Sequence, residues 1–159
     1  MEAGIELNRI SRDLCEIDKN YLRILKSGME ILNDFLIGIG LYDVSKHLNL
    51  ELKENALYFS FLNSNYLIAI IQPEYTIRDA ELLSQKARLV TYLLDEEEDG
   101  EKKEIRELNF FFTVTKNIYK SSEGADYPEF PDFLYDYFRI FKEYILSDKS
   151  IKTTITYGR

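Results

Sequence analysis

Apolar residues recur at alternating spacings of three and four over the first 35 residues, and this pattern constrains the fold most. The positions are Leu7, Ile10, Leu14, Ile17, Tyr21, Ile24, Gly28, Ile31 and Phe35. Such a heptad pattern predicts an amphipathic helix whose apolar residues form one seam. We expect a helix over about residues 4–38, continuous or bent at Gly28. The alternative is a helix that breaks at Gly28, because Lys26 and Gly28 also resemble a basic last turn and its glycine cap.

From residue 48 the spacing of apolar residues changes to the period of two that is typical of β-strands. Residues 48–52 and 57–61 predict two half-buried strands, and the wholly apolar run 66–71 predicts a third strand that is covered on both faces. The simplest arrangement is a three-stranded meander. Because proline cannot donate a hydrogen bond to a sheet, we expect the third strand to end at Pro73.

Residues 79–94 fit two different structures. On a helical wheel their apolar residues share one arc, which predicts an amphipathic helix that begins at Asp79. In the alternative, residues 87–94 are one arm of a hairpin with residues 105–116. The apolar and polar residues separate onto opposite faces of the helical wheel, and this separation favours the helix. We therefore predict the helix.

The rest of the chain completes a mixed fold. Residues 108–115 predict a strand, residues 132–147 a helix with an aromatic face, and residues 151–157 a last strand. The predicted fold class is therefore α+β in a single domain over residues 1–159. It contains a long N-terminal helix, a mostly antiparallel sheet of about five strands, and two further amphipathic helices at 79–94 and 132–147.

Composition excludes several classes of partner. The chain carries 20 Lys and Arg against 28 Asp and Glu, and the net charge of −8 disfavours nucleic acid. A single cysteine indicates a reducing compartment, and no Cys/His pair has the spacing of metal ligands. No apolar run is long enough to cross a membrane. We expect a cytoplasmic protein with no cofactor, no metal, no nucleic-acid partner and no membrane partner.

Candidate catalytic residues all have simpler explanations. His47 lies in a connector after the long helix, and Cys15 flanks the apolar seam with no histidine near it in sequence. Asp132 is a favourable charge in the first turn of its helix, and Asp136 belongs to the solvated face of the same helix. These interpretations favour a protein that is not an enzyme.

The length of the first helix predicts a binding surface. More than 30 helical residues reach roughly 50 Å, whereas a compact chain of this size is about 40 Å across. A continuous helix therefore overhangs its own domain, and soluble monomers seldom leave such a long apolar stripe exposed. We expect a protein partner, most simply a second copy in a homodimer, to cover the seam. The predicted contact residues are Leu7, Ile10, Leu14, Ile17, Tyr21 and Ile24.

Two further surfaces are candidates. The loop from Tyr127 to Pro131 is stiffened by two prolines and predicts a second partner contact through Tyr127 and Phe130, unless Phe130 folds back onto the following helix. The main hypothesis is an interaction module of adaptor, chaperone or inhibitor type. The alternative is a small-molecule sensor or an enzyme, with a pocket between the sheet and helix 132–147. That pocket would be lined by Tyr135, Tyr137 and Phe141.

Overall fold

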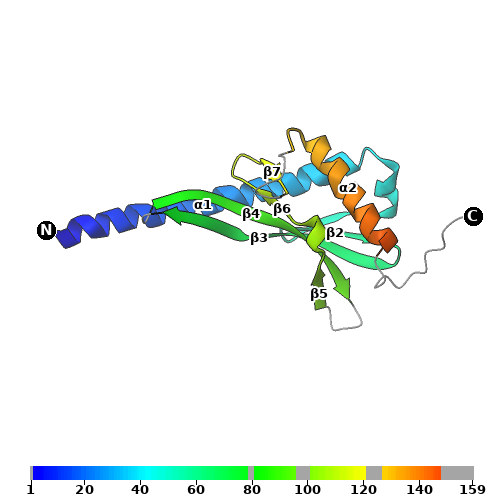
Figure 1. The fold of residues 1–159 in the computed structure, drawn as a ribbon, viewed down its shortest axis with the longest axis horizontal. Helices are drawn as coiled ribbons and strands as arrows, with labels where there is room; N and C mark the ends of the chain where they lie inside the picture. The colour runs from blue at the N-terminus through cyan, green and yellow to red at the C-terminus, as the bar shows by residue number, and fades with distance from the viewer. Residues whose placement is uncertain (1, 79–80, 96–100, 121–126, 148–159) are drawn as a thin grey trace, which may run out of the picture.

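The computed structural model describes residues 2–78, 81–95, 101–120 and 127–147, and these form an α+β fold, as the sequence predicts. Two α-helices lie on one face of a mostly antiparallel sheet (Figure 1). In chain order the elements are α1 (Glu2–Ile39), η1 (Asp43–His47), β1 (Glu51–Lys53), β2 (Ala56–Phe61), β3 (Ser64–Arg78), β4 (Glu81–Asp95), β5 (Glu101–Glu104), η2 (Arg106–Leu108), β6 (Phe110–Phe112), β7 (Ile118–Tyr119) and α2 (Phe130–Ser147).

Helix α1 is continuous over 38 residues and passes through Gly28 without a break. Its C-terminal half packs on the sheet, where Ile24, Ile31 and Phe35 are buried. Gly28 permits this close packing, because a Cβ atom there would lie 2.5 Å from Cδ1 of Ile70 and 2.9 Å from Cζ of Phe112. The predicted long helix is confirmed, and the alternative of a helix broken at Gly28 is wrong.

The sheet has the strand order β1-β2-β3-β4-β6-β7, and β5 pairs with the C-terminal part of β4. The predicted meander of the first three strands is confirmed. Each of its turns has two central residues with positive φ, namely Glu54 and Asn55 in the first and Leu62 and Asn63 in the second. Two-residue turns of this kind match the right-handed twist of antiparallel strands.

The helix predicted over residues 79–94 is wrong, because this segment forms β4. Strand β4 pairs with β3 from Leu94 opposite Asn65 to Glu81 opposite Arg78, so the two form one long hairpin. The alternative hairpin is confirmed in part, since residues 87–89 of β4 pair with residues 110–112 of β6. Pairing with β3 and β6 makes this segment a strand, although its apolar residues also fit one side of a helix.

The predicted end of β3 at Pro73 is also wrong. The strand continues to Arg78, and its pairing with β4 shifts register between Ile71 and Glu74. A β-bulge at this point interrupts the regular hydrogen bonding, so that no backbone N–H is needed at Pro73. Prolines within sheets are commonly accommodated at such bulges. The last strand predicted over residues 151–157 lies outside the described residues.

The core lies between the sheet and both helices. Phe141 of α2 packs edge-on against Tyr66 of β3, with ring centroids 5.2 Å apart. Tyr137 of α2 contacts Phe35 of α1 at 5.0 Å, and its hydroxyl shares a buried hydrogen bond of 2.7 Å with Oγ1 of Thr91 in β4. These contacts lock α2, the sheet and the C-terminal half of α1 together.

We predict that Gly28→Ala lowers the free energy of unfolding by up to about 2 kcal/mol. Forcing a methyl group against Ile70 and Phe112 costs about 1–3 kcal/mol, which exceeds the gain of about 1 kcal/mol from replacing glycine in a helix. Urea unfolding at one protein concentration measures the change. Gly4→Ala is the matched control, because no atom lies within 4 Å of its new Cβ and the substitution should not destabilise. Equal stability of the Gly28→Ala protein and the wild type would contradict the close packing.

Candidate protein-binding surfaces

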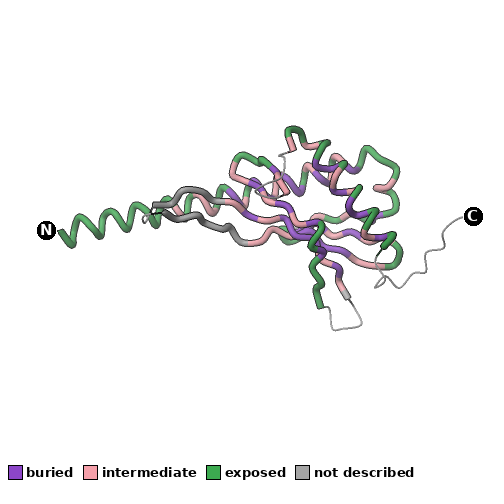
Figure 2. The backbone as a smooth tube through the Cα atoms, in the orientation of Figure 1, coloured by how far each residue is buried: buried purple, intermediate pink, exposed green. Residues whose placement is uncertain are grey.

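The first turns of α1 extend past the ends of β3 and β4 (Figure 1) and are exposed around the helix (Figure 2). The side chains of Leu7, Ile10 and Leu14 are 66%, 51% and 61% exposed. Ile17 is half-buried. We call these four residues the N-terminal stripe.

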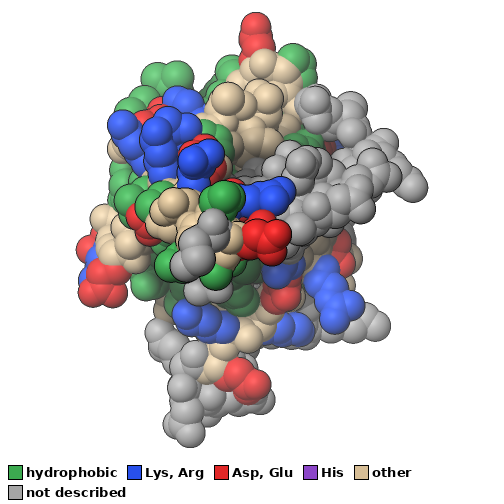
Figure 3. All heavy atoms as spheres, turned by 90° about the vertical axis from the view of Figure 1, so that its left-hand side faces the viewer, with side chains coloured by type: hydrophobic (Ala, Val, Ile, Leu, Met, Phe, Trp, Pro, Cys, Tyr) green, Lys and Arg blue, Asp and Glu red, His purple; other side chains and the backbone are tan. Residues whose placement is uncertain are grey.

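The stripe continues the face of α1 that is buried farther along the helix. Leu7 and Leu14 repeat every seven residues through Tyr21 to Gly28, and this repeat keeps them on one side of the helix. Tyr21 is half-buried, whereas Ile24 is fully buried inside the chain. Ile24 therefore does not belong to the open surface on which the sequence prediction placed it. Figure 3, seen from the N-terminal side, shows hydrophobic side chains at the surface beside Lys and Arg side chains.

A second apolar surface lies at the opposite end of α1. It is a groove of about 920 Å³ that runs along α2 from Pro131 to Leu146, and we call it the α2 groove. Its other wall comes from the C-terminal end of α1, the η1 segment and the β2–β3 turn, through residues that include Tyr42, Val44 and Leu62. Because these segments are distant in sequence, the pattern of residues gives no local signal for the groove.

The groove differs from the pocket predicted between the sheet and helix 132–147. Tyr135 and Phe141 do line it, but Tyr137 is turned into the core, where it bonds to Thr91. Burial raises the pKa of Tyr137 and keeps its hydroxyl neutral, so this group acts as a structural hydrogen-bonding partner. The predicted set of three lining residues is therefore only partly brought together.

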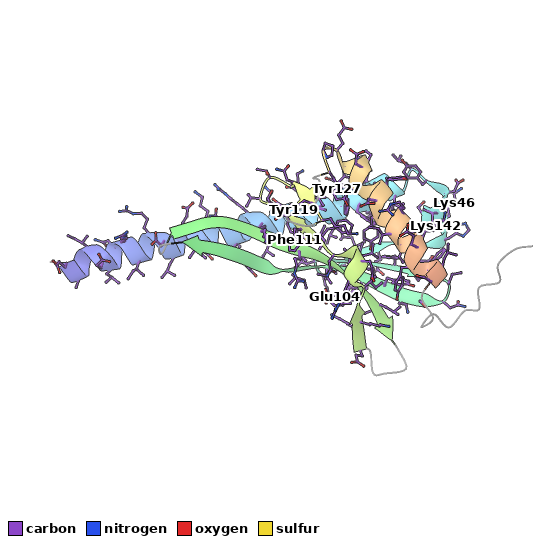
Figure 4. The ribbon with its side chains drawn as sticks, in the orientation of Figure 1. Lys46, Glu104, Phe111, Tyr119, Tyr127 and Lys142 are labelled. Atoms are coloured by element: carbon purple, nitrogen blue, oxygen red, sulfur yellow. The ribbon has the colours of Figure 1, made fainter. Side chains whose placement is uncertain are left out.

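The charged residues that line the groove are both basic. Arg139 pairs with Asp136 at 2.5 Å and with Glu143 at 3.0 Å, so its charge is compensated on α2 itself. Lys142 lies at the edge of the same groove (Figure 4), and no ion pair to it is found among the described residues. The rim therefore offers one uncompensated positive charge to an occupant.

The loop before α2 is held by contacts within the chain. The Tyr127 ring lies 5.9 Å from the rings of Phe110 and Phe133, and its hydroxyl donates a hydrogen bond to Asp136. Phe130 is the first residue of α2 and packs at 5.4 Å from Phe133. Both predicted contact residues are half-buried in this way, so a role for them in partner binding stays a prediction.

The outer face of the sheet carries aromatic and basic residues that the sequence reasoning missed. Phe111 of β6 stacks on Tyr119 of β7 at 5.5 Å, and the ammonium group of Lys86 lies 4.6 Å from the Phe111 ring (Figure 4). The basic residue comes from the neighbouring strand β4, so a search along the sequence around Phe111 does not find it. Because these side chains are half-buried and already contact one another, they offer less open surface than the N-terminal stripe.

The remaining chemical candidates are spread over the chain: Cys15 is next to Leu14 of the stripe, and His47 and Asp132 are next in sequence to residues that line the α2 groove. Cys15 and His47 are exposed, and Asp132 accepts a hydrogen bond of 3.2 Å from the backbone of Glu129 at the start of α2. Among the described residues, no group of three His, Cys, Asp or Glu side chains is placed to hold a metal ion. Within the same part of the chain, no helix has both the length and the apolar character needed to span a membrane.

Comparisons with protein-family models, with curated proteins and with solved structures found no significant match to this chain.

We predict that Asp136→Asn destabilises the protein by about 1–2 kcal/mol at pH 7, because it removes the charge from the hydrogen bonds that hold Tyr127 and Arg139. Burial alone would raise the pKa of Asp136, but hydrogen bonds from Tyr127 and Arg139 outweigh burial and lower it. A lowered pKa in the folded state stabilises the fold above the pKa of the unfolded chain, and this contribution is lost as the pH falls through the folded pKa.

The difference in unfolding free energy between the wild type and Asp136→Asn should therefore shrink below about pH 4. Urea unfolding at a series of pH values measures it. A difference that stays constant from pH 7 to pH 3 would show that the charge of Asp136 does not stabilise the loop.

Proposed function

We propose that this chain is a non-enzymatic protein–protein interaction module, of adaptor, chaperone or inhibitor type, that self-associates through the N-terminal stripe. The observation that carries the proposal is the exposure of Leu7, Ile10 and Leu14 on a helix that extends beyond the sheet. Large apolar stripes of this kind mark interaction sites in soluble proteins.

Burying the stripe supplies a driving force of useful size. Full burial of one Leu or Ile side chain stabilises by about 1.5–3 kcal/mol, so three such residues contribute several kcal/mol. That contribution is comparable with the free-energy cost of the translational and rotational freedom that two chains lose on association. The C-terminal half of α1 is fixed to the sheet by Ile24, Ile31 and Phe35, so the turns that carry the stripe extend from an anchored helix.

The two terminal strands of the sheet are short. Among the described strands, β1 has three residues and β7 has two, so each offers few backbone groups for an added strand. Residues 70–78 of β3 pair with β4 and, within the described part of the chain, have no strand on their other side. The stripe on α1 is the surface whose exposed apolar side chains carry the proposal.

We predict that the wild type is a dimer of about twice 18.8 kDa and that Leu14→Glu makes it a monomer. The reason is that a carboxylate in the stripe loses its water on association, at a cost of several kcal/mol. Size-exclusion chromatography with light scattering measures the mass. Circular dichroism should show folded protein in both cases, since an exposed substitution changes stability little.

Ile37→Glu is the matched control. Ile37 lies on the same helix with the same 61% exposure as Leu14, but about 140° around the helix axis from it. This variant should keep the mass of the wild type. A monomeric wild type, or equal effects of the two substitutions, would overturn the proposal.

A further inference from the structure

The N-terminal stripe and the α2 groove lie at opposite ends of one rigid helix. From Ile10 in the stripe to Ile39, which lines the groove, α1 rises by about 44 Å. The stripe therefore cannot fold back into the groove of its own chain. One surface is convex and the other is concave, so a second copy of the chain presents to each surface the shape that it lacks.

The two surfaces also match in length. The α2 groove follows α2 from Pro131 to Leu146, a rise of about 22 Å. The segment of α1 from Ala3 to Ile17, which carries the stripe, rises about 21 Å. An amphipathic helix that lays its apolar side into a groove of equal length is a common way to recognise a protein.

Charges beside the two surfaces are opposite in sign. Glu6 and Asp13 stand four residues before and three residues after Ile10, so both lie on the flank of the stripe. Arg12 lies on the far side of the helix from the stripe, and Arg9 stands three residues after Glu6 and four before Asp13, beside both. The groove offers Lys142 at its edge, and an acidic flank placed there gains an ion pair. A neutral hydrocarbon ligand would leave Lys142 without such a pair.

We infer that the N-terminal stripe of one chain docks into the α2 groove of a second copy, with Glu6 or Asp13 next to Lys142. This inference rests on the proposed self-association and names the surface that receives the stripe. Placing each stripe in the other chain's groove gives a pair with two equivalent contacts. Such a pair is two-fold symmetric and closed, which limits the assembly to a dimer.

Cross-linking between two differently labelled chains tests the contact. In a Cys15→Ser background, one chain carries Ile10→Cys in the stripe and the other carries Tyr135→Cys in the groove. Both positions are exposed in the single chain, so the substitutions should not prevent folding. After mixing and treatment with a short bismaleimide, mass spectrometry should find position 10 of one chain linked to position 135 of the other. Ile37→Cys in place of Ile10→Cys is the control and should give no linked chains.

The outcomes separate this inference from the proposed function. Links between position 10 and position 10, with no link to position 135, would show that two α1 helices pair directly. The inference would then be wrong, while self-association through the stripe would stand. A monomeric wild type would overturn both. A mass that keeps rising with concentration would overturn the closed pair.

Charge reversal gives an independent test on the same dimer. Lys142→Glu should weaken association by up to about fivefold, which is the upper end of the range for one exposed ion pair. Lys142→Glu is then combined with Glu6→Lys in one variant and with Asp13→Lys in another. One of the two combinations should restore the wild-type dissociation constant. Which one restores it shows the direction in which the helix lies in the groove. Dissociation constants from sedimentation equilibrium measure both effects. Rescue by neither substitution would overturn the inference.

Discussion

The structure depends on one face of α1 that is longer than the sheet on which it packs. The seam runs through the whole helix, but the sheet and α2 cover it only from about Ile24 onward. Because a helix is stiff, the apolar residues before that point cannot turn away from water independently of the rest. Gly28 sets the contact by letting the helix backbone approach Ile70 and Phe112 closely. The same rigid contact that builds the core therefore holds the N-terminal stripe away from it.

The sequence predicts those parts of the fold in which one face of an element is buried and the opposite face is polar. Helix α1, helix α2 and strands β1 and β2 have this property, and their periods are clear. Strand β4 does not, because Val90 is buried on the face opposite Leu89. With apolar residues on both faces, the period of two disappears and the remaining pattern also fits a helix. Pairing with β3 decides the structure, and that contact is not local in sequence.

One of the two candidate surfaces can be predicted from the sequence, and the other cannot. The exposed part of the stripe follows from the length of the helix and the register of the seam, and both can be read from residues 7–35. The point where burial begins, at Ile24, cannot be read in this way because it depends on where the sheet ends. The α2 groove does not follow from sequence, because Tyr42, Leu62 and Leu146 meet only in the folded chain. The orientation of Tyr137 depends on a bond to Thr91 across the core. Its place on the inner side of α2 follows from the four-residue spacing of Phe133, Tyr137 and Phe141, whereas its bond to Thr91 emerges only from packing.

Net charge sets a condition on any self-association of this chain. Two copies with a charge of −8 repel each other at long range, so general electrostatic attraction cannot bring them together. Much of the negative charge lies between Asp95 and Glu107, which hold eight acidic and three basic residues. In the described part of this segment, β5 and η2 adjoin β4, away from both the N-terminal stripe and the α2 groove. Long-range repulsion is screened by salt, whereas apolar burial is not, so an association driven by Leu7, Ile10 and Leu14 gains strength as the ionic strength rises.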